Sequence, residues 1–431
     1  MSLSVIILAA GQGTRMKSSL PKVLHPISGL PMLHYVIKAA QAVSDDITVV
    51  LYHQADRIKE ALSASFEGLK FQLQDHENYP GTGGAVMNIP TQHERVLVLN
   101  GDMPLITAEA LEPLTSSNAD ITMSVFDLEN SSGYGRVVVN NGEVEAIVEE
   151  KDCTEEQKRI KTVNAGIYVF KKEVLDRYLP QLSNDNAQAE YYLTDIIKMA
   201  RDDKLHVKPV WVVEESFKGV NSRYDLARAE EIMQNRIKEK WMRAGVTMHL
   251  PSTIYIDSRA IFHGDCTLDN GVTIHGETVI TESHIKSHTV IEDAEIKNSS
   301  CGPMARIRPG TVLEDSHIGN YVEVKKSHLK GVKAGHLSYI GDAEVDEGTN
   351  IGAGTITCNY DGLKKHKTKI GKNVFIGSDT QLVAPVTIED NVMIAAGTTV
   401  TKDVKEGALA IARTPQKIVE DFFHRFFKVK K

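Results

Sequence analysis

A strict repeat in the C-terminal half reads Ile370-Gly-Lys-Asn-Val-Phe-Ile376-Gly-Ser-Asp-Thr-Gln-Leu382-Val-Ala-Pro-Val-Thr-Ile388-Glu-Asp-Asn-Val-Met-Ile394-Ala-Ala-Gly-Thr-Thr-Val400. An aliphatic residue occupies every sixth position. An α-helix repeats after about 3.6 residues and a strand after two, so neither explains this step. A coil with flat sides of six residues does explain it, because each side then points one aliphatic side chain at a narrow axis. The repeat predicts a β-solenoid.

The same six-residue spacing of aliphatic residues occurs earlier, at Leu268, Ile274 and Ile280. It occurs again from Ile285 onward, where the pattern is displaced by one residue. Gly, Asn and Asp follow several of the aliphatic residues, where tight corners need them. One polar stretch, from Thr357 to Lys367, interrupts the repeat. It is either an idle insertion or a functional loop, and we favour function because rigid scaffolds commonly carry functional loops.

The first 220 or so residues have a different pattern, in which short apolar runs alternate with helical stretches. This alternation predicts a doubly wound, mostly parallel sheet with ligands at the carboxyl ends of its strands. The expected strands are Ser4–Ala10, Ile47–Tyr52, Val96–Asn100, Ile121–Phe126 and Ile167–Phe170, and the expected helices include Pro31–Val43, Asp56–Ala64 and Ala108–Thr115. The charged stretch Arg223–Ala244 reads as a connecting helix. We therefore expect an α/β domain over 1–222, a helical linker over 223–246 and a solenoid domain over 247–431.

The composition excludes several classes of protein. A formal charge of -8 argues against a nucleic-acid partner, which usually requires a basic surface. No apolar run reaches membrane-spanning length, and the first residues lack the features of a secretory signal. The four cysteines are scattered without paired spacing, as expected of reduced thiols. These features predict a cytoplasmic protein without stable membrane insertion.

A glycine loop, Leu8-Ala-Ala-Gly-Gln-Gly-Thr-Arg-Met16, follows the first expected strand. It lacks the third Rossmann glycine and the Walker lysine-serine pair, so a plain βα turn is the alternative interpretation. However, its glycines let backbone N–H groups approach a triphosphate, and Arg15 and Lys22 add cations within a short distance along the chain. Asp102 follows a buried strand, where it either caps the next turn or binds magnesium.

Several short motifs follow one another in the order found in sugar-nucleotide pyrophosphorylases. They are Leu8–Met16, Pro21-Lys22, Gly81-Thr-Gly83, Asn100-Gly-Asp102, Gly133-Tyr-Gly-Arg136, Ile147-Val-Glu149, Asn164-Ala-Gly166 and Gly219-Val-Asn221. The six-residue repeats follow these motifs in the sequence. Taken together, the two halves make the chain resemble the bifunctional N-acetylglucosamine-1-phosphate uridyltransferases/glucosamine-1-phosphate acetyltransferases over nearly all of its 431 residues. The resemblance implies an α/β Rossmann-like nucleotidyltransferase domain followed by a left-handed parallel β-helix of hexapeptide repeats.

The resemblance also implies two reactions. Acetyl-CoA acetylates glucosamine 1-phosphate, and UTP then transfers its uridylyl group to N-acetylglucosamine 1-phosphate with release of pyrophosphate. The product, UDP-N-acetylglucosamine, is a precursor of peptidoglycan and lipopolysaccharide. Mg²⁺ and a homotrimer are implied as well. The alternatives are a pyrophosphorylase for another sugar phosphate with a non-catalytic solenoid, a regulatory protein without activity, and a structural array.

The resemblance assigns residues in the N-terminal half by position. Arg15 and Lys22 are the implied catalytic cations, and Asp102 and Asn221 the implied Mg²⁺ ligands. The implied contacts to UTP and UDP-N-acetylglucosamine are Leu8, Ala9, Ala10, Gly11, Lys22, Gln74, Gly81, Thr82, Asn100, Gly101, Asp102, Gly135, Glu149, Asn164 and Asn221. Two features depart from the family pattern. Asn100 replaces the usual tyrosine, and the stretch Asp75–Pro80 is about two residues longer, which makes the assignment of Gln74 to the base the weakest one.

In the solenoid, Lys333-Ala-Gly-His336 matches the motif of the family's catalytic base. By residue type alone, His336 is as well explained as a solvated side chain. Acetyl transfer requires a base, because a protonated amine does not attack a thioester and a neutral imidazole accepts its proton. Glu323 is implied to orient the imidazole. The implied amino-sugar contacts are Arg308, Lys325, Tyr339, Asn350 and Asn359, and the implied acetyl-CoA contacts are Ala353, Tyr360, Ser378, Ala396 and Arg413.

The tail Asp421–Phe427 offers an aromatic face followed by basic residues. Binding to a membrane surface is one interpretation. Packing against the protein's own trimer is the one we prefer.

Overall fold

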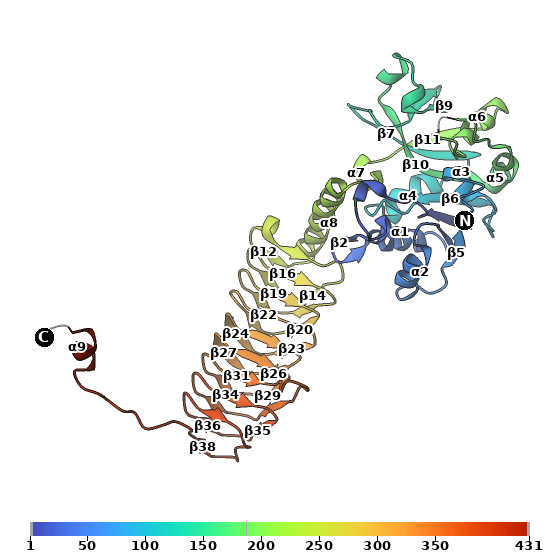
Figure 1. The fold of residues 1–431 in the computed structure, drawn as a ribbon. Helices are drawn as coiled ribbons and strands as arrows, with labels where there is room; N and C mark the ends of the chain where they lie inside the picture. The colour runs from blue at the N-terminus through green and yellow to red at the C-terminus, as the bar shows by residue number, and fades with distance from the viewer. Residues whose placement is uncertain (1–2, 187, 429–431) are drawn as a thin grey trace. The chain divides into compact units, whose positions relative to one another are not determined.

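The computed structural model describes residues 3–186 and 188–428. It divides into two compact units with a boundary between Met233 and Gln234. The first unit is built on one sheet, drawn in blue to green in Figure 1, with strand order β11-β7-β10-β6-β1-β4-β5. These strands are β1 (Ser4–Leu8), β4 (Asp46–Leu51), β5 (Lys70–Leu73), β6 (Arg95–Asn100), β7 (Ile121–Asp127), β10 (Thr162–Lys171) and β11 (Val207–Trp211).

The expected α/β fold with a mostly parallel sheet is confirmed, although β10 runs antiparallel to both of its neighbours in this strand order. Strand β1 pairs in parallel with β4 and β6, whereas β10 runs antiparallel to β6 and β7. The helices of this unit are α1 (Met32–Gln41), α2 (Ala55–Ser63), α3 (Gly81–Val86), α4 (Ala108–Thr115), α5 (Lys172–Tyr178), α6 (Asp195–Asp202) and α7 (Glu214–Phe217). Val5 and Ile7 belong to one buried cluster and Ile6 to another, so the strands are buried on both faces.

Sequence reasoning missed a hairpin formed by β8 (Arg136–Asn140) and β9 (Glu143–Val148). Its turn residues, Asn141 and Gly142, have φ angles of 50° and 81°. Asn-Gly with two positive φ angles is the preferred two-residue hairpin turn, so this dipeptide was the available signal. A second small pair, β2 (Pro26–Ile27) with β3 (Leu30–Pro31), precedes α1.

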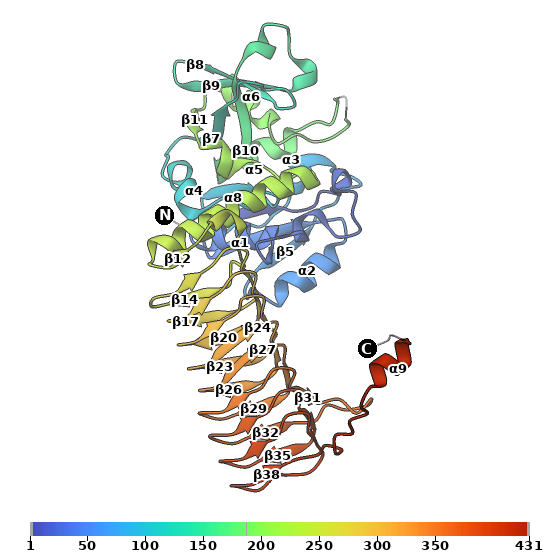
Figure 2. The ribbon, with the colours of Figure 1, turned by 90° about the vertical axis from the view of Figure 1, so that its left-hand side faces the viewer.

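The second unit is a coil of three parallel sheets, in which every third strand from β12 to β37 belongs to the same sheet and β38 pairs with β36 (Figure 2). The first sheet contains β12 (Thr247–Met248), β15 (Thr267–Leu268), β18 (His284–Ile285), β21 (Ser300–Cys301), β24 (His317–Asn320), β27 (Lys333–His336), β30 (Asn350–Ile351), β33 (Phe375–Ile376), β36 (Met393–Ile394) and β38 (Leu409–Ala410). The second contains β13 (Tyr255–Ile256), β16 (Thr273–His275), β19 (Val290–Glu292), β22 (Arg306–Ile307), β25 (Glu323–Lys325), β28 (Tyr339–Gly341), β31 (Ile356–Cys358), β34 (Gln381–Val383) and β37 (Thr399–Val400). The third contains β14 (Ile261–His263), β17 (Val279–Thr281), β20 (Ala294–Lys297), β23 (Thr311–Glu314), β26 (His328–Lys330), β29 (Ala343–Val345), β32 (Thr368–Ile370) and β35 (Val386–Ile388).

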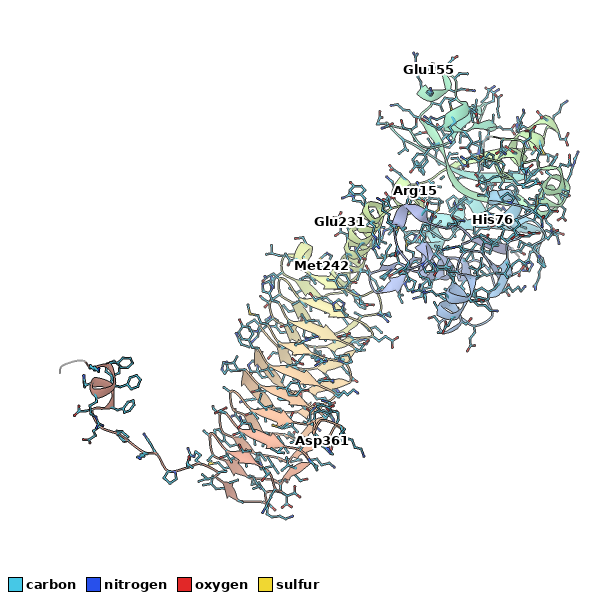
Figure 3. All side chains as sticks on the ribbon, in the orientation of Figure 1. Arg15, His76, Glu155, Glu231, Met242 and Asp361 are labelled. Carbon is cyan, nitrogen blue, oxygen red and sulfur yellow. The ribbon has the colours of Figure 1, made fainter. Side chains whose placement is uncertain are left out.

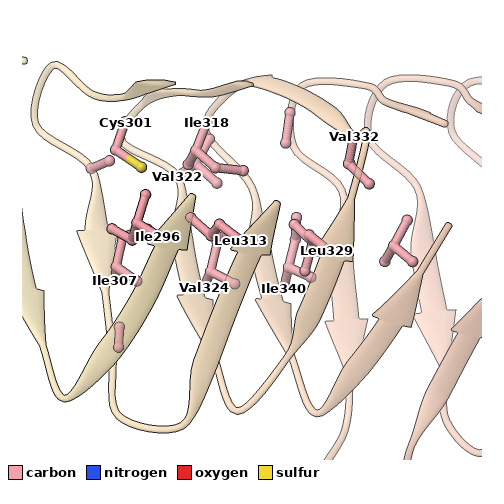
Figure 4. Close-up of a cluster of buried hydrophobic side chains, with 14 of the residues drawn as sticks. Ile296, Cys301, Ile307, Leu313, Ile318, Val322, Val324, Leu329, Val332 and Ile340 are labelled. Atoms are coloured by element: carbon pink, nitrogen blue, oxygen red, sulfur yellow. The ribbon is translucent and has the colours of Figure 1, made fainter. Parts of the chain in front are cut away.

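The aliphatic residues of the six-residue repeat fill the interior of this coil. Ile318, Val324 and Leu329, one from each sheet of a single turn, are fully buried, and Figure 4 shows them pointing inward. Burying one such side chain contributes about 1.5–3 kcal/mol, so the stack of aliphatic residues is the main source of stability of this unit. The predicted solenoid is confirmed, and the loop between β31 and β32 marks the predicted interruption.

Helix α8 (Arg223–Arg243) covers the expected connecting helix, and its last turns close the open end of the coil. Gln234 donates to the carbonyl of Ile256 at 2.7 Å and accepts from the N–H of Ile256 at 3.0 Å. Lys238 donates to the carbonyls of Pro251 at 2.9 Å and Ile254 at 3.3 Å. Strand β13 is the edge of its sheet, so Gln234 acts there in place of a neighbouring strand. The domain limits given above stay a prediction.

No helix within the described residues combines the length and the apolar character that crossing a bilayer requires.

Candidate active sites

Four predicted residues of the first unit meet in one hydrogen-bonded network. Lys22 Nζ lies 2.5 Å from Asp102 Oδ2 and 3.2 Å from Asn221 Oδ1. Arg15, which is labelled in Figure 3, donates from Nη2 to the same Asn221 oxygen at 2.9 Å. Asp102 follows β6, and Asn221 precedes α8, so residues far apart in the sequence converge beyond the carboxyl end of a central strand. Two cations and two oxygen ligands therefore lie within hydrogen-bonding distance of one another.

A cavity of about 510 Å³ collects a second set of predicted residues. It is lined by Leu8, Thr82, Asn100, Glu149 and Asn164. The surrounding protein desolvates the Glu149 carboxyl and raises its pKa, and the carboxylates of Asp152 and Asp195 add to this shift. A carboxylate held in a cavity is a good acceptor for the hydroxyl groups of a sugar.

The glycine loop and its neighbours lie beside these groups. Gly101 donates its N–H to the carbonyl of Leu8 at 2.9 Å, and Ala9 donates to the carbonyl of Val50 at 2.9 Å. A Cβ at Gly11 would meet nothing within 4 Å, so its backbone is open to a ligand. Gly135 accepts at 3.0 Å from the N–H of Asn164, which places it next to the cavity.

The side chain of Gln74 forms hydrogen bonds with backbone carbonyl groups. Its amide donates to the carbonyls of Tyr79 and Gly81, both at 3.0 Å, and thereby fixes the longer loop Asp75–Pro80. A second contact of this loop is the stack of His76 on Tyr52, with ring centroids 4.5 Å apart. Both amide hydrogens of Gln74 are used in these bonds, so only its amide oxygen can accept a further hydrogen bond.

In the coil, the amino-sugar candidates lie on and beside the second sheet, with the exception of Asn350. Arg308 donates to Glu323 at 2.7 Å, and Asn359 donates to Asp342 at 2.5 Å and lies 3.5 Å from the Tyr339 hydroxyl. Lys325 accepts the N–H of Asp342 at its carbonyl. Asn350 belongs to the first sheet, next to Lys333.

His336 ends β27, at the corner between the first and second sheets. It is exposed, and the Glu323 carboxylate accepts from Arg308. Within the described part of the chain, Glu323 pairs with Arg308 and no bond to the imidazole is seen, so its orienting role stays a prediction. Burial and the positive charges of Lys286 and Lys333, together with His336, lower the pKa of the neighbouring His317.

The acetyl-CoA candidates other than Tyr360 follow this same corner on successive turns. Ala353 accepts at its carbonyl from Asp379, and Ser378 accepts from Gly397, both at 2.8 Å. A Cβ at Gly377 would collide with Ala396, and one at Gly397 would contact Arg413. Tyr360 lies elsewhere, on the loop between β31 and β32 that carries Asp361, labelled in Figure 3. His336 and these backbone positions thus form one row along the coil.

Comparison with known proteins agrees with the fold of both halves of the chain. Residues 5–164 match the family model of the MobA-like NTP transferase domain, and residues 367–402 match that of six bacterial transferase hexapeptide repeats. The bifunctional protein GlmU of a Nitratiruptor species is 62% identical over 427 residues, or 99% of each chain. GlmU of a Sulfurovum species is 64% identical over 427 residues, also 99% of each chain, and GlmU of Wolinella succinogenes is 58% identical over 431 residues, all of each chain.

The chain belongs to the GlmU family. It is therefore a bifunctional uridyltransferase/acetyltransferase of UDP-N-acetylglucosamine synthesis, with UTP and acetyl-CoA as substrates. The similarity to GlmU spans both halves, so a pyrophosphorylase with an idle solenoid, a regulatory protein and a structural array no longer apply.

The structure adds residues that sequence reasoning did not assign within the GlmU fold. Tyr192, Leu193 and Thr194 line the cavity with Glu149. Leu193 donates its N–H to the Thr82 hydroxyl at 3.2 Å, and Tyr191 exchanges backbone hydrogen bonds with Pro80 and Gly83. Asp342 is the partner of Asn359 in the coil. The available signal was weak, since these residues belong to no motif quoted above.

Proposed function

We propose that the two reactions of the GlmU family take place at two separate sites of this chain. Uridylyl transfer takes place between the network of Arg15, Lys22, Asp102 and Asn221 and the adjoining cavity, and acetyl transfer takes place at the corner of the coil that carries His336. The observation that carries the first assignment is the convergence of Lys22, Asp102 and Asn221 within 3.2 Å.

Charge is the main obstacle to uridylyl transfer, because an anionic sugar phosphate must approach the α-phosphorus of UTP. Its oxygen is already a nucleophile, so no general base is required. Arg15 and Lys22 neutralise the triphosphate and the departing pyrophosphate, while Glu149 and Asn164 hold the sugar. Fixed cations of this kind stabilise charge that develops in the transition state.

Asp102 and Asn221 fit Mg²⁺ by their chemistry. They offer a carboxylate and a carboxamide oxygen that contact the same ammonium group. Among the described residues, no group of three or more acidic, histidine or cysteine side chains offers a complete metal cage. Mg²⁺ commonly binds through one or two protein oxygens and completes its shell with substrate phosphates and water. Asp102 and Asn221 would hold the ion, which would supply positive charge to the phosphates, while the Lys22 ammonium contributes a second cation to the triphosphate.

In acetyl transfer, His336 removes a proton from the amine as its nitrogen bonds to the thioester carbonyl carbon, and the carbon–sulfur bond then breaks so that CoA leaves and takes up that proton as the free thiol. Arg308 and Lys325 hold the phosphate of glucosamine 1-phosphate, with Tyr339, Asn350 and Asn359 around the sugar. The row from Ala353 to Arg413 accommodates acetyl-CoA.

We place this site at the contacts of a homotrimer, as the family resemblance implies. Within one coil, His336 lies at the corner after the first sheet, whereas the loop carrying Tyr360 leaves after the second. The corner also exposes a ladder of apolar side chains on successive turns, with Met304 43%, Tyr321 58% and Leu337 62% accessible. All three have φ angles near 50°, an unfavourable conformation for such residues, which supports a packing role for this corner. We also propose that the protein is cytoplasmic and that its aromatic tail packs on the trimer.

Mixing of subunits tests the shared site. One chain carries His336→Ala, and the other carries Tyr360→Gly with Lys365→Gly in the projecting loop. Each homo-oligomer is expected to be defective in acetyl transfer, and co-expression is expected to restore activity beyond the sum of the two. A mixture that is no better than its parts would show that the loop and His336 serve the same site within one chain.

A further inference from the structure

Strand β10 contains a bulge at the point where it borders the cavity. Its register with β7 shifts between Asn164, opposite Val125, and Tyr168, opposite Met123. Two extra residues are therefore accommodated in β10, and Gly166 adopts a φ of 79°. A bulge re-aims a side chain at the cost of ladder hydrogen bonds, and such bulges are common beside active sites.

Side chains replace the hydrogen bonds that the bulge removes. Asn164 Oδ1 accepts from the N–H of Gly166 at 2.9 Å, and the Ser124 hydroxyl bonds both the N–H and the carbonyl of Ile167 at 3.1 Å. The carbonyl of Gly166 accepts from Asn100 Nδ2 at 3.0 Å. Asn100 is the last residue of β6, so this donor reaches the bulge from the neighbouring strand.

Asn164 is fixed on both sides as a result. Its own Nδ2 donates to the Tyr168 hydroxyl at 2.6 Å, and Asn100, Asn164, Gly166 and Tyr168 all line the same cavity. A Cβ at Gly166 would lie 2.8 Å from Asn100 Nδ2, so the glycine is what lets the amide approach. The turn that presents Asn164 to the cavity is thus closed by Asn100.

We propose that Asn100 is a positioning residue for the sugar phosphate, acting through Gly166 and Asn164 and not through the nucleotide. This inference rests on the proposed assignment of the cavity to the sugar. It gives a role to the side chain of Asn100, whose short amide donates to the bulge carbonyl.

The test is steady-state uridylyl transfer by the full-length chain, with UTP and N-acetylglucosamine 1-phosphate varied separately. Asn100→Asp keeps the shape and removes the donor, which leaves the Gly166 carbonyl facing a carboxylate. We expect the KM for N-acetylglucosamine 1-phosphate to rise about tenfold, as for loss of a hydrogen bond to a partly buried group, while the KM for UTP stays unchanged. Asn100→Ala removes the donor without adding charge, and should give a smaller shift in the same direction.

Asn140→Asp is the matched control, because it makes the same chemical change at an amide that donates to Glu145 outside the cavity. Both of its KM values should equal those of the wild type. If the Asn100 variants raise the KM for UTP as much as that for the sugar phosphate, or move neither, the positioning role is wrong. If Asn100→Asp does not fold, as judged by its thermal transition, the KM values of Asn100→Ala decide whether the positioning role is right. A wild-type chain that releases no pyrophosphate would instead contradict the proposed function.

Discussion

The ammonium group of Lys22 and the carboxylate of Asp102 are in direct contact, with Nζ 2.5 Å from Oδ2. Both side chains are largely shielded from solvent, so their attraction is weakly screened. Under the proposed assignment we expect UTP binding to break this contact, with Lys22 pairing with phosphate and the Asp102 carboxylate becoming available as an oxygen ligand.

Removing the charge of Asp102 should therefore disable one activity alone. Asp102→Asn is expected to lower kcat for pyrophosphate release by about 100-fold or more, the usual effect of losing a key electrostatic group. Free CoA release from acetyl-CoA should be unchanged. Asp120→Asn, which removes the partner of Lys171 elsewhere in the same unit, serves as control and should leave both activities intact. Equal losses in both assays for Asp102→Asn would point to a folding defect.

Glu149 should make folding stability depend on pH. Its pKa is raised in the folded protein, so between the ordinary glutamate pKa and this raised value the folded state binds more protons than the unfolded state. Stability then falls as pH rises through that window. Glu149→Gln should increase the free energy of unfolding at neutral pH, and the gain should vanish as pH falls below the ordinary glutamate range. Denaturant unfolding at several pH values measures this difference.

Asp152 offers an internal check, because its carboxylate contributes to the shift. In an Asp152→Asn background the gain from Glu149→Gln should be smaller. A gain that is independent of pH in both backgrounds would mean that the charge of Glu149 is not its source.

The cap formed by Gln234 should matter for the stability of the coil. Gln234→Leu leaves the N–H and the carbonyl of Ile256 without their side-chain partner, and each unsatisfied buried group costs about 1–3 kcal/mol. We expect an earlier denaturant transition of the second unit and faster proteolysis near β13. Arg243→Gln removes an exposed pair with Glu239 at the end of the same helix and should have almost no effect. Similar transitions for both variants would show that Gln234 is not a cap.

The loop between β31 and β32 is held together by Asp361. Its carboxylate accepts from the N–H groups of Leu363 and Lys364 and contacts His366 at 2.6 Å. Asp361→Ala should loosen the loop and raise the KM for acetyl-CoA about three- to tenfold, as for loss of one or two hydrogen bonds. Uridylyl transfer should be unaffected. Asp346→Ala, which changes an exposed aspartate on the coil, is the control. An unchanged KM for acetyl-CoA in Asp361→Ala would show that the loop is not part of the acetyl-CoA site.

The parts of the structure that sequence reasoning found are those with a local signal. The six-residue spacing of aliphatic residues from Ile370 to Val400 predicts the coil, because each side of the coil must bury one aliphatic residue. Lys22 and Asp102 were found through motifs, and their contact follows from the shared carboxyl edge of a parallel sheet. Asn100 and Gly166 each belong to a motif, but their hydrogen bond and the position of Tyr192 in the cavity wall depend on tertiary packing, which leaves no period or motif in the sequence. The pairing of Glu323 with Arg308 was missed for the same reason.

The most direct test of the two-site account is a paired assay on the purified full-length protein with Mg²⁺. One assay follows free CoA from acetyl-CoA and glucosamine 1-phosphate, and the other follows pyrophosphate from UTP and N-acetylglucosamine 1-phosphate. His336→Ala should abolish CoA release and spare pyrophosphate release, and Asp102→Ala should do the reverse. Loss of both activities in either variant, or CoA release that survives His336→Ala, would contradict the two-site account.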